Sequence, residues 1–176
     1  MFVDEVGASL KGVVGTSWAP KGQTPRVEHC CKWEKLSCIG GITPEGEVIE
    51  QRYKHSIKSA EIVTFLRHLA QTLQGKLLVF WDNASIHRSC LVKAYLDSDE
   101  GQRFTIQPLP PYAPECNPIE WLWAWVKKNH LANLAAKTLA ELVEVWQYAL
   151  DKARSNKHLI QACFRASAVA HVLELT

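Results

Sequence analysis

The 176-residue sequence has no long hydrophobic run, although 47% of its residues are hydrophobic. A helix that crosses a membrane needs roughly 18 or more consecutive apolar residues, and no stretch of the sequence approaches that length. The first residues, MFVDEV, also lack the basic and then apolar regions of a secretory signal peptide. We therefore expect a cytoplasmic protein without membrane association.

The sequence also lacks the cysteine patterns of metal clusters and disulfide frameworks. It has six cysteines, but none forms a Cys-x-x-Cys pair and two of them are adjacent. We expect reduced thiols that serve as small packing residues, as is usual in reducing compartments. These are Cys30, Cys31, Cys38, Cys90, Cys116 and Cys163.

Charge of one sign is not in large excess, since 20 basic and 18 acidic residues give a net charge of +2. A protein that holds duplex DNA usually carries a dense basic face, because neutralised phosphates supply much of the affinity. The C-terminal third has only a modest positive bias. Charge alone would not predict a nucleic-acid-binding protein.

The length suits one domain with a single core, and the sequence shows no repeat, low-complexity tract or linker. The first half has strand patterns. A very short strand over residues 2 and 3 leads into Asp4, and residues 9–14 suggest a second strand. Residues 33–42 and 48–53 predict a strand pair, joined by the turn signal TPEG.

The pattern then changes period. Apolar residues at helical spacing predict a helix over residues 59–73, which Gly75 would end. Residues 76–82 form a continuous apolar run of strand length, typical of a strand covered on both faces. A short helix over residues 87–96 and a strand over residues 104–107 follow.

The remainder is helical. Asn117 and Pro118 are a capping residue and a first-position proline, and residues 138–141 form a capping box before an amphipathic helix. A last helix is expected over about residues 158–173. This order of elements predicts an α/β domain with a mixed central sheet flanked by helices, and extra helices at the C-terminus.

Three carboxylates stand out. Asp82 closes an apolar strand, and sites of open α/β sheets lie beyond the carboxyl ends of their strands; alternatively, it caps the turn that follows. Asp4 ends the first strand or is a solvated loop residue. Glu120 is the third residue of a helix, where it could stabilise the helix start by about 1 kcal/mol or less without any catalysis.

Together these residues favour a metal site. If the first strand and the Asp82 strand are neighbours, both carboxylates emerge at one end of the sheet. The segment before Glu120 is long enough to return a helix to that end. Converging carboxylates repel one another and are relieved by Mg²⁺ or Mn²⁺, which prefer oxygen ligands. Two such ions can activate a water or a 3′-hydroxyl and stabilise the leaving oxygen of a phosphodiester.

Five ordered motifs carry a family resemblance. They are FVDE (residues 2–5), WAPKG (18–22), WDNASIH (81–87), LPPYAPECNPIE (109–120) and WLW (121–123). With these, the chain resembles the DDE transposases of the mariner-like superfamily, in their bacterial insertion-sequence branch. The fourth motif is close to the family's LPPYSPxLNPIE, with Cys116 where the family usually has leucine. The resemblance covers essentially the whole chain.

The resemblance implies a ribonuclease-H-like fold, like that of retroviral integrases, as one DDE catalytic domain over residues 1–176. It assigns catalysis and the binding of two Mg²⁺ or Mn²⁺ ions to Asp4, Asp82 and Glu120. The implied activity is nicking of double-stranded DNA at transposon ends, followed by attack of the freed 3′-hydroxyl on target DNA, by a homodimer.

Two other interpretations stay open. The helix-turn-helix regions that family members carry before the catalytic domain are not in this sequence. A separately encoded part could supply them, or the chain could be an inactive remnant or regulator that binds DNA or transposase subunits. A cellular nuclease such as a junction resolvase would act without transposon ends, but residues 109–120 argue against it.

Three residues are candidates for DNA contacts. His87 could lie near the scissile phosphate, support a metal ligand from behind, or hydrogen-bond to the backbone of its own loop. Lys127 and Lys128 follow the Glu120 helix and could hold phosphates or form a solvated helix end.

The aromatic residues and the second acidic residue of the first strand complete the expectations. Trp121 and Trp125, at i and i+4, are expected in the core more than on a DNA-stacking surface. Glu5 alternates with Asp4 along the strand and should face away from the metal ions.

Overall fold

One five-stranded mixed sheet organises the chain, in the computed structural model that describes residues 1–24, 26 and 32–170. The strand order is β3-β2-β1-β4-β5; β1, β2 and β3 are antiparallel, whereas β4 lies parallel to β1 and β5 parallel to β4. The strands are β1 (Phe2–Ser9), β2 (Lys35–Ile42), β3 (Val48–Tyr53), β4 (Leu77–Trp81) and β5 (Phe104–Pro108). The predicted α/β class with a mixed sheet is confirmed.

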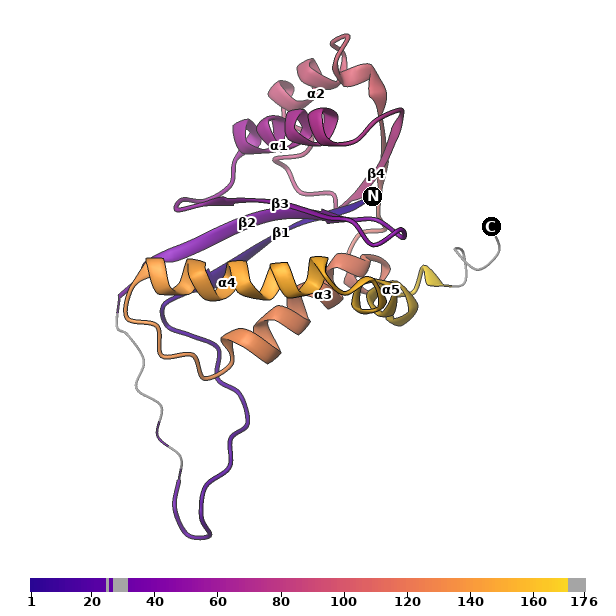
Figure 1. Ribbon diagram of the computed structural model, residues 1–176. Helices are drawn as coiled ribbons and strands as arrows, with labels where there is room; N and C mark the ends of the chain where they lie inside the picture. The colour runs from indigo at the N-terminus through magenta and orange to yellow at the C-terminus, as the bar shows by residue number, and fades with distance from the viewer. Residues whose placement is uncertain (25, 27–31, 171–176) are drawn as a thin grey trace.

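Helices cover both faces of this sheet (Figure 1). One face carries α1 (Ser59–Thr72) and α2 (Cys90–Leu96), and the other carries α3 (Pro118–Val126), α4 (Leu139–Arg154) and α5 (Lys157–Ala166). Short 3₁₀ turns lie at Gly101–Arg103 and Pro114–Cys116, and a π-helical segment, η3 (Lys127–Leu131), continues α3. No helix in the described ranges is long and apolar enough to cross a membrane.

The first strand differs from the prediction. It is eight residues long, and β2 pairs with it along its whole length. These backbone hydrogen bonds support the strand through its two acidic residues, which is why the apolar pattern alone ended it too early. The predicted separate strand over residues 9–14 is wrong, since Ser9 is the last residue of β1 and Val13 makes only an isolated bridge, to Ala132.

Asp4 therefore lies inside β1 and not at its end. In the parallel pairing of β1 with β4, Phe2 lies opposite Phe80. Extending this register by two residues places Asp4 beside Asp82, the first residue after β4. The expected neighbourhood of the two strands is confirmed, although the positions of the carboxylates along them differ.

The helices also differ at their ends. Ser89 caps α2 by accepting a hydrogen bond from the backbone N–H of Val92, so α2 begins later than residue 87, which lies in a turn. The last helix ends at Ala166; residues 171–173 of the predicted helix lie outside the described residues. The predicted cap of α4 is confirmed, because Thr138 accepts a hydrogen bond from the Glu141 N–H.

Side chains of β1 alternate between two cores. Phe2 and Val6 pack with the residues of α3, α4 and α5, whereas Val3 packs with those of α1 and α2. Because side chains of a strand point alternately to the two faces, Asp4 shares the α3 face and Glu5 shares the α1 face.

A close contact between helix and sheet fixes α3. Trp123 is fully buried, and its ring lies over Gly40 of β2, the residue paired with Asp4. A Cβ at Gly40 would lie 2.8 Å from Trp123 Cη2, so only glycine allows this approach. Trp125 packs against the same core, but the prediction that Trp121 is a core residue is wrong, since it is 43% exposed.

The cysteines of the described ranges have free thiols, in agreement with the expectation. Cys38 and Cys163 are buried, Cys116 is partly buried and Cys90 is exposed. Cys30 and Cys31 lie outside the described residues.

Candidate active site

The three predicted acidic residues line one cleft of about 410 Å³. Its walls come from β1, the loop after β4, the proline-rich segment after β5 and the start of α3. The lining residues are Asp4, Asp82, Asn83, Ala84, Leu109, Pro110, Pro111, Tyr112, Ala113, Pro114, Asn117 and Glu120. The sheet register and the return of α3 to the same edge therefore bring together residues that are far apart in the sequence.

Asp82 combines the two roles left open by the sequence. Its Oδ1 accepts a hydrogen bond of 2.8 Å from the Ala84 N–H, which is the turn-capping role. Its side chain is nevertheless 55% exposed and lines the cleft. Capping orients the carboxylate, while its exposure leaves it accessible to a ligand.

Asp4 has the most perturbed electrostatic surroundings of the three. Burial, and then the negative charges of Glu120 and Glu5, raise the pKa of Asp4 to about 8. The Asp82 charge contributes least to this rise, and a hydrogen bond with the Glu5 backbone partly opposes it. A carboxyl group in such surroundings gains from a nearby cation, because a cation favours its charged form.

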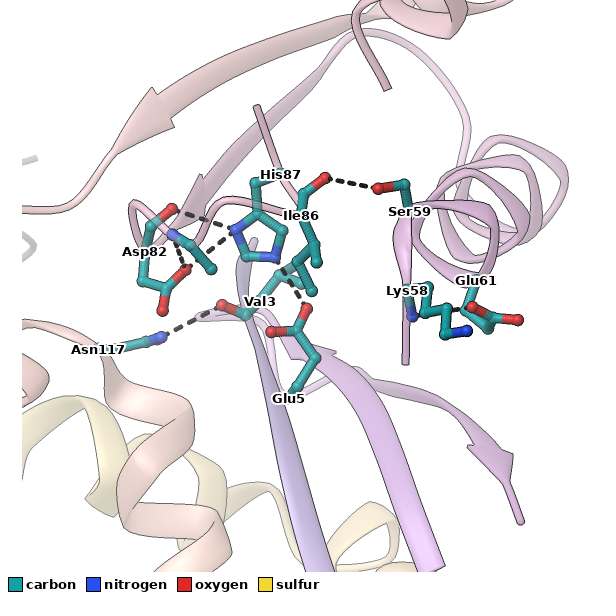
Figure 2. Close-up of polar contacts among 10 residues, drawn as sticks. Val3, Glu5, Lys58, Ser59, Glu61, Asp82, Ile86, His87 and Asn117 are labelled. Atoms are coloured by element: carbon teal, nitrogen blue, oxygen red, sulfur yellow. Dashed lines mark hydrogen bonds and ion pairs between the residues drawn. The ribbon is translucent and has the colours of Figure 1, made fainter. Parts of the chain in front are cut away.

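Glu120 lies in the first turn of α3 and is exposed on the cleft wall. Asn117 precedes the helix, but its side chain makes no capping hydrogen bond there, in contrast to the prediction. Its Nδ2 donates instead to the Val3 carbonyl, at 3.2 Å, within β1 (Figure 2). Asn117 thus ties the start of the Glu120 helix to the strand that carries Asp4.

The donor set fits a hard divalent cation. The three carboxylates offer oxygen ligands, and the buried Oδ1 of Asn117 has no hydrogen-bond partner among the described residues, although Asn117 lines the cleft. Within the described ranges, no three His, Cys, Asp or Glu side chains lie close enough to form a preassembled metal cage. The carboxylates share a cleft, and a metal ion would draw them together.

His87 lies behind this cleft. It is 4% exposed, is not a lining residue and stacks on Trp81, with ring centroids 4.4 Å apart. Its Nδ1 is 3.1 Å from the Asp82 carbonyl oxygen and 3.0 Å from Asp82 Oδ1, and its Nε2 is 2.9 Å from Glu5 Oε1 (Figure 2). Burial lowers the pKa of His87, but Glu5 and then Asp82 raise it, and the net direction is upward.

These contacts revise two expectations. Glu5 does not line the cleft, which agrees with its predicted orientation, yet it is joined to Asp82 through His87. Direct contact of His87 with DNA does not suit its buried position. The sequence could not show this chain of contacts, because Glu5 and His87 are 82 positions apart.

The rim of the cleft holds one residue that the sequence analysis did not single out. Tyr112 is fully exposed, and its backbone has the left-handed conformation, with φ of 57°. That conformation is costly for a residue with a Cβ and is often found at functional sites. Lys127 is partly buried and Lys128 exposed, both in η3 at the far end of α3 from Glu120.

Comparisons with known proteins agree with this architecture. The family described as DDE superfamily endonuclease matches residues 1–143, whereas no protein of curated function matches the sequence. The structure is similar to the Mos1 strand transfer complex, with a TM-score of 0.71 and 17% identity, over 93% of this chain and 50% of that chain.

The catalytic domain of Mos1 mariner transposase is also similar, with a TM-score of 0.61 and 16% identity, over 93% of this chain and 75% of that chain. The chain thus spans about half the length of the protein in the strand transfer complex and more of the isolated domain. At these identities the likeness shows the fold, which is the predicted ribonuclease-H-like one. The family match covers most of the sequence, and the chain belongs to the DDE superfamily endonucleases.

Proposed function

We propose that the chain is a transposase catalytic domain that cleaves DNA phosphodiesters at transposon ends and transfers the 3′-hydroxyl into target DNA, with divalent metal ions. The observation that carries this proposal is the cleft that Asp4, Asp82 and Glu120 line together. Membership of the DDE superfamily endonucleases supports the reaction class.

The three carboxylates would hold two Mg²⁺ or Mn²⁺ ions. The Mos1 mariner paired end complex, a similar fold, has been solved with Mn and with Mg. Bound ions of this kind polarise the phosphodiester and increase the nucleophilicity of water or of a 3′-hydroxyl. Asp4 must lose its proton to become a ligand, and Asn117 would keep Glu120 in place beside it through the Val3 carbonyl.

The two steps are exchanges at phosphorus. In cleavage, water forms a bond to phosphorus and the 3′-oxygen leaves with a proton. One fragment of the nicked strand then ends in a 3′-hydroxyl and the other in a 5′-phosphate. In strand transfer, that 3′-hydroxyl forms a new bond to phosphorus in the target while the target's own 3′-oxygen leaves. One P–O bond replaces another, so the second step needs no further energy source.

Double-stranded DNA is the proposed partner. Lys127 and Lys128 lie about 10 Å along the helix axis from Glu120, at 1.5 Å per residue, and could hold phosphates that flank the scissile one. We also propose a homodimer in the active complex, end recognition by a separately encoded helix-turn-helix part, and a cytoplasmic, nucleoid-associated location.

A nicking assay with matched variants tests the proposal. Purified chain is incubated with Mn²⁺ or Mg²⁺ and supercoiled DNA that carries the element's inverted repeats, and open-circle product is measured. Asp82→Asn keeps an oxygen that can accept the Ala84 hydrogen bond, so the fold should survive while nicking is abolished. Glu115→Gln, the same chemical change at an exposed residue outside the cleft, should leave nicking unchanged.

The outcomes separate the alternatives. Nicking that survives Asp82→Asn contradicts the assignment of the site. A folded wild-type chain that binds metal but never nicks, even with a helix-turn-helix part added, is an inactive remnant or regulator. Equal nicking of branched DNA without transposon ends would instead indicate a resolvase-like nuclease.

A further inference from the structure

We propose that His87 and Glu5 are positioning residues that hold the Asp82 carboxylate in the orientation needed to bind metal. This inference rests on the proposed function, because it assumes that Asp82 is a metal ligand. Neither residue would touch the metal or the DNA, since neither lines the cleft.

The His87 ring is held on three sides. Its Nδ1 faces Asp82, with Oδ1 at 3.0 Å and the carbonyl oxygen at 3.1 Å. Its Nε2 faces Glu5 Oε1 at 2.9 Å, and its plane stacks on Trp81 at an angle of 15°. With 1% of the side chain exposed, water does not compete for these contacts, and the ring has no room to turn.

Asp82 needs such support because it follows the last residue of β4 and its side chain is 55% exposed. A carboxylate in that position would otherwise rotate about its side-chain bonds. The Ala84 N–H donates to Oδ1, and His87 Nδ1, which is hydrogen-bonded to the Asp82 carbonyl oxygen, lies 3.0 Å from the same Oδ1. The carboxylate is thereby oriented before any ligand arrives, which reduces the entropy lost when a metal ion binds.

Glu5 links this support to the rest of the site. It is adjacent to Asp4 in β1, and the strand turns the two side chains to opposite faces. Asp4 itself lines the cleft. Glu5 instead contacts His87, which contacts Asp82 (Figure 2). Two of the proposed ligands are thus positioned by consecutive residues of one central strand.

The effect expected of such partners is large. Groups that orient metal ligands through hydrogen bonds typically change metal affinity by 10- to 100-fold when they are removed. The simplest competing explanation is that His87 and Glu5 affect metal affinity only through their charges, and not by orienting Asp82. The two explanations differ at His87, whose ring nitrogens face oxygen atoms of Asp82 and Glu5.

If charge alone matters, replacing His87 by a neutral residue leaves metal binding unchanged or tightens it. If His87 positions Asp82, the same replacement weakens binding. For Glu5 the comparison is between Glu5→Gln and Glu5→Ala. Both remove the negative charge, but only Gln keeps an oxygen that can accept the His87 hydrogen bond.

The experiment measures Mn²⁺ affinity on the full chain without DNA, from the electron paramagnetic resonance signal of free Mn²⁺. We expect His87→Gln and Glu5→Ala each to weaken binding by about 10- to 100-fold, and Glu5→Gln to recover much of the loss. The variant that combines His87→Gln with Glu5→Ala should bind Mn²⁺ no more weakly than the weaker-binding single variant, because both substitutions act through the contact between His87 and Asp82.

Ser59→Ala is the matched control. Ser59 Oγ donates to the Ile86 carbonyl at 3.3 Å, so it ties the same loop to α1 without contacting Asp82 (Figure 2). Its replacement should leave Mn²⁺ affinity within about twofold. If Ser59→Ala weakens binding as much as His87→Gln does, the effect is loop order and the inference is overturned.

Further outcomes are decisive. Tighter binding in His87→Gln, or equal losses in Glu5→Gln and Glu5→Ala, would overturn the inference in favour of charge. If His87→Gln fails to fold by circular dichroism, the Glu5 pair carries the test by itself. Asp82→Asn separates failure of the proposed function from failure of this inference. If Asp82→Asn leaves Mn²⁺ affinity unchanged, the proposed function fails. If Asp82→Asn lowers Mn²⁺ affinity but the His87 and Glu5 variants do not, only this inference is refuted.

Discussion

Replacing Asp4 by asparagine should make the metal-free protein more stable at alkaline pH. The pKa of the Asp4 carboxyl is about 8 in the folded chain, because of burial and then the charges of Glu120 and Glu5, against 3.8 as its ordinary value. The folded chain therefore binds one more proton than the unfolded chain between about pH 4 and pH 8. Stability contributed by this group falls as pH rises through that window and is constant above it.

The magnitude follows from the linkage relation. One proton bound in the folded state alone changes stability by about 1.36 kcal/mol per pH unit. Between pH 6 and pH 9 the wild type should lose about 2.5 kcal/mol through Asp4, and Asp4→Asn should not. For a domain of this size, 1 kcal/mol moves Tm by about 2–4 °C. The variant should thus gain roughly 5–10 °C over the wild type across that range.

The assay is thermal unfolding followed by circular dichroism, in EDTA, from pH 6 to pH 9. Glu115→Gln, an exposed carboxylate outside the cleft, is the control and should follow the wild type. Millimolar Mg²⁺ should then raise the wild-type Tm at pH 9 and raise that of Asp4→Asn less. If wild type and Asp4→Asn have the same pH slope, Asp4 is not the buried, repelled carboxyl described above.

Three further changes have defined outcomes. Gly40→Ala would push Trp123 and α3 off the sheet, because the added Cβ would lie 2.8 Å from the ring; chemical denaturation should show a loss of about 1–3 kcal/mol. If the fully exposed ring of Tyr112 at the cleft rim stacks on an unpaired base, Tyr112→Ala should weaken binding of single-stranded DNA by about 1–3 kcal/mol, and unchanged affinity would contradict such stacking. Replacing Lys127 or Lys128 by alanine should each reduce the slope of log binding constant against log salt concentration by about one. An unchanged slope would show that the lysine contacts no phosphate.

The sequence predicted well those elements whose apolar pattern matches their burial. The helical spacing that became α1 matches its buried residues, whereas in β4 only Val79 and Trp81 are buried and Leu78 is exposed. The three acidic residues were predicted to share one site because parallel strands end at the same edge of a sheet, and because residues 109–120 resemble a family motif. The side chains then line one cleft.

The errors arise where tertiary contacts outweigh local pattern. The length of β1 depends on pairing with β2, which no property of residues 4–9 reveals. Asn117 has the sequence position of a helix cap, but its side chain bonds to the distant Val3 carbonyl. Trp121 and Trp123 look alike in sequence, and only the contact with Gly40 shows which of them is the core residue.

The central claim is that Asp4, Asp82 and Glu120 bind divalent metal, and anomalous diffraction from crystals soaked in Mn²⁺ tests it most directly. We expect one or two manganese peaks in the cleft, within about 2.0–2.4 Å of oxygens from these carboxylates, and we expect the peaks to be lost in Asp82→Asn crystals. Saturating Mn²⁺ that gives no peak in the cleft, or a peak that survives Asp82→Asn unchanged, would contradict it.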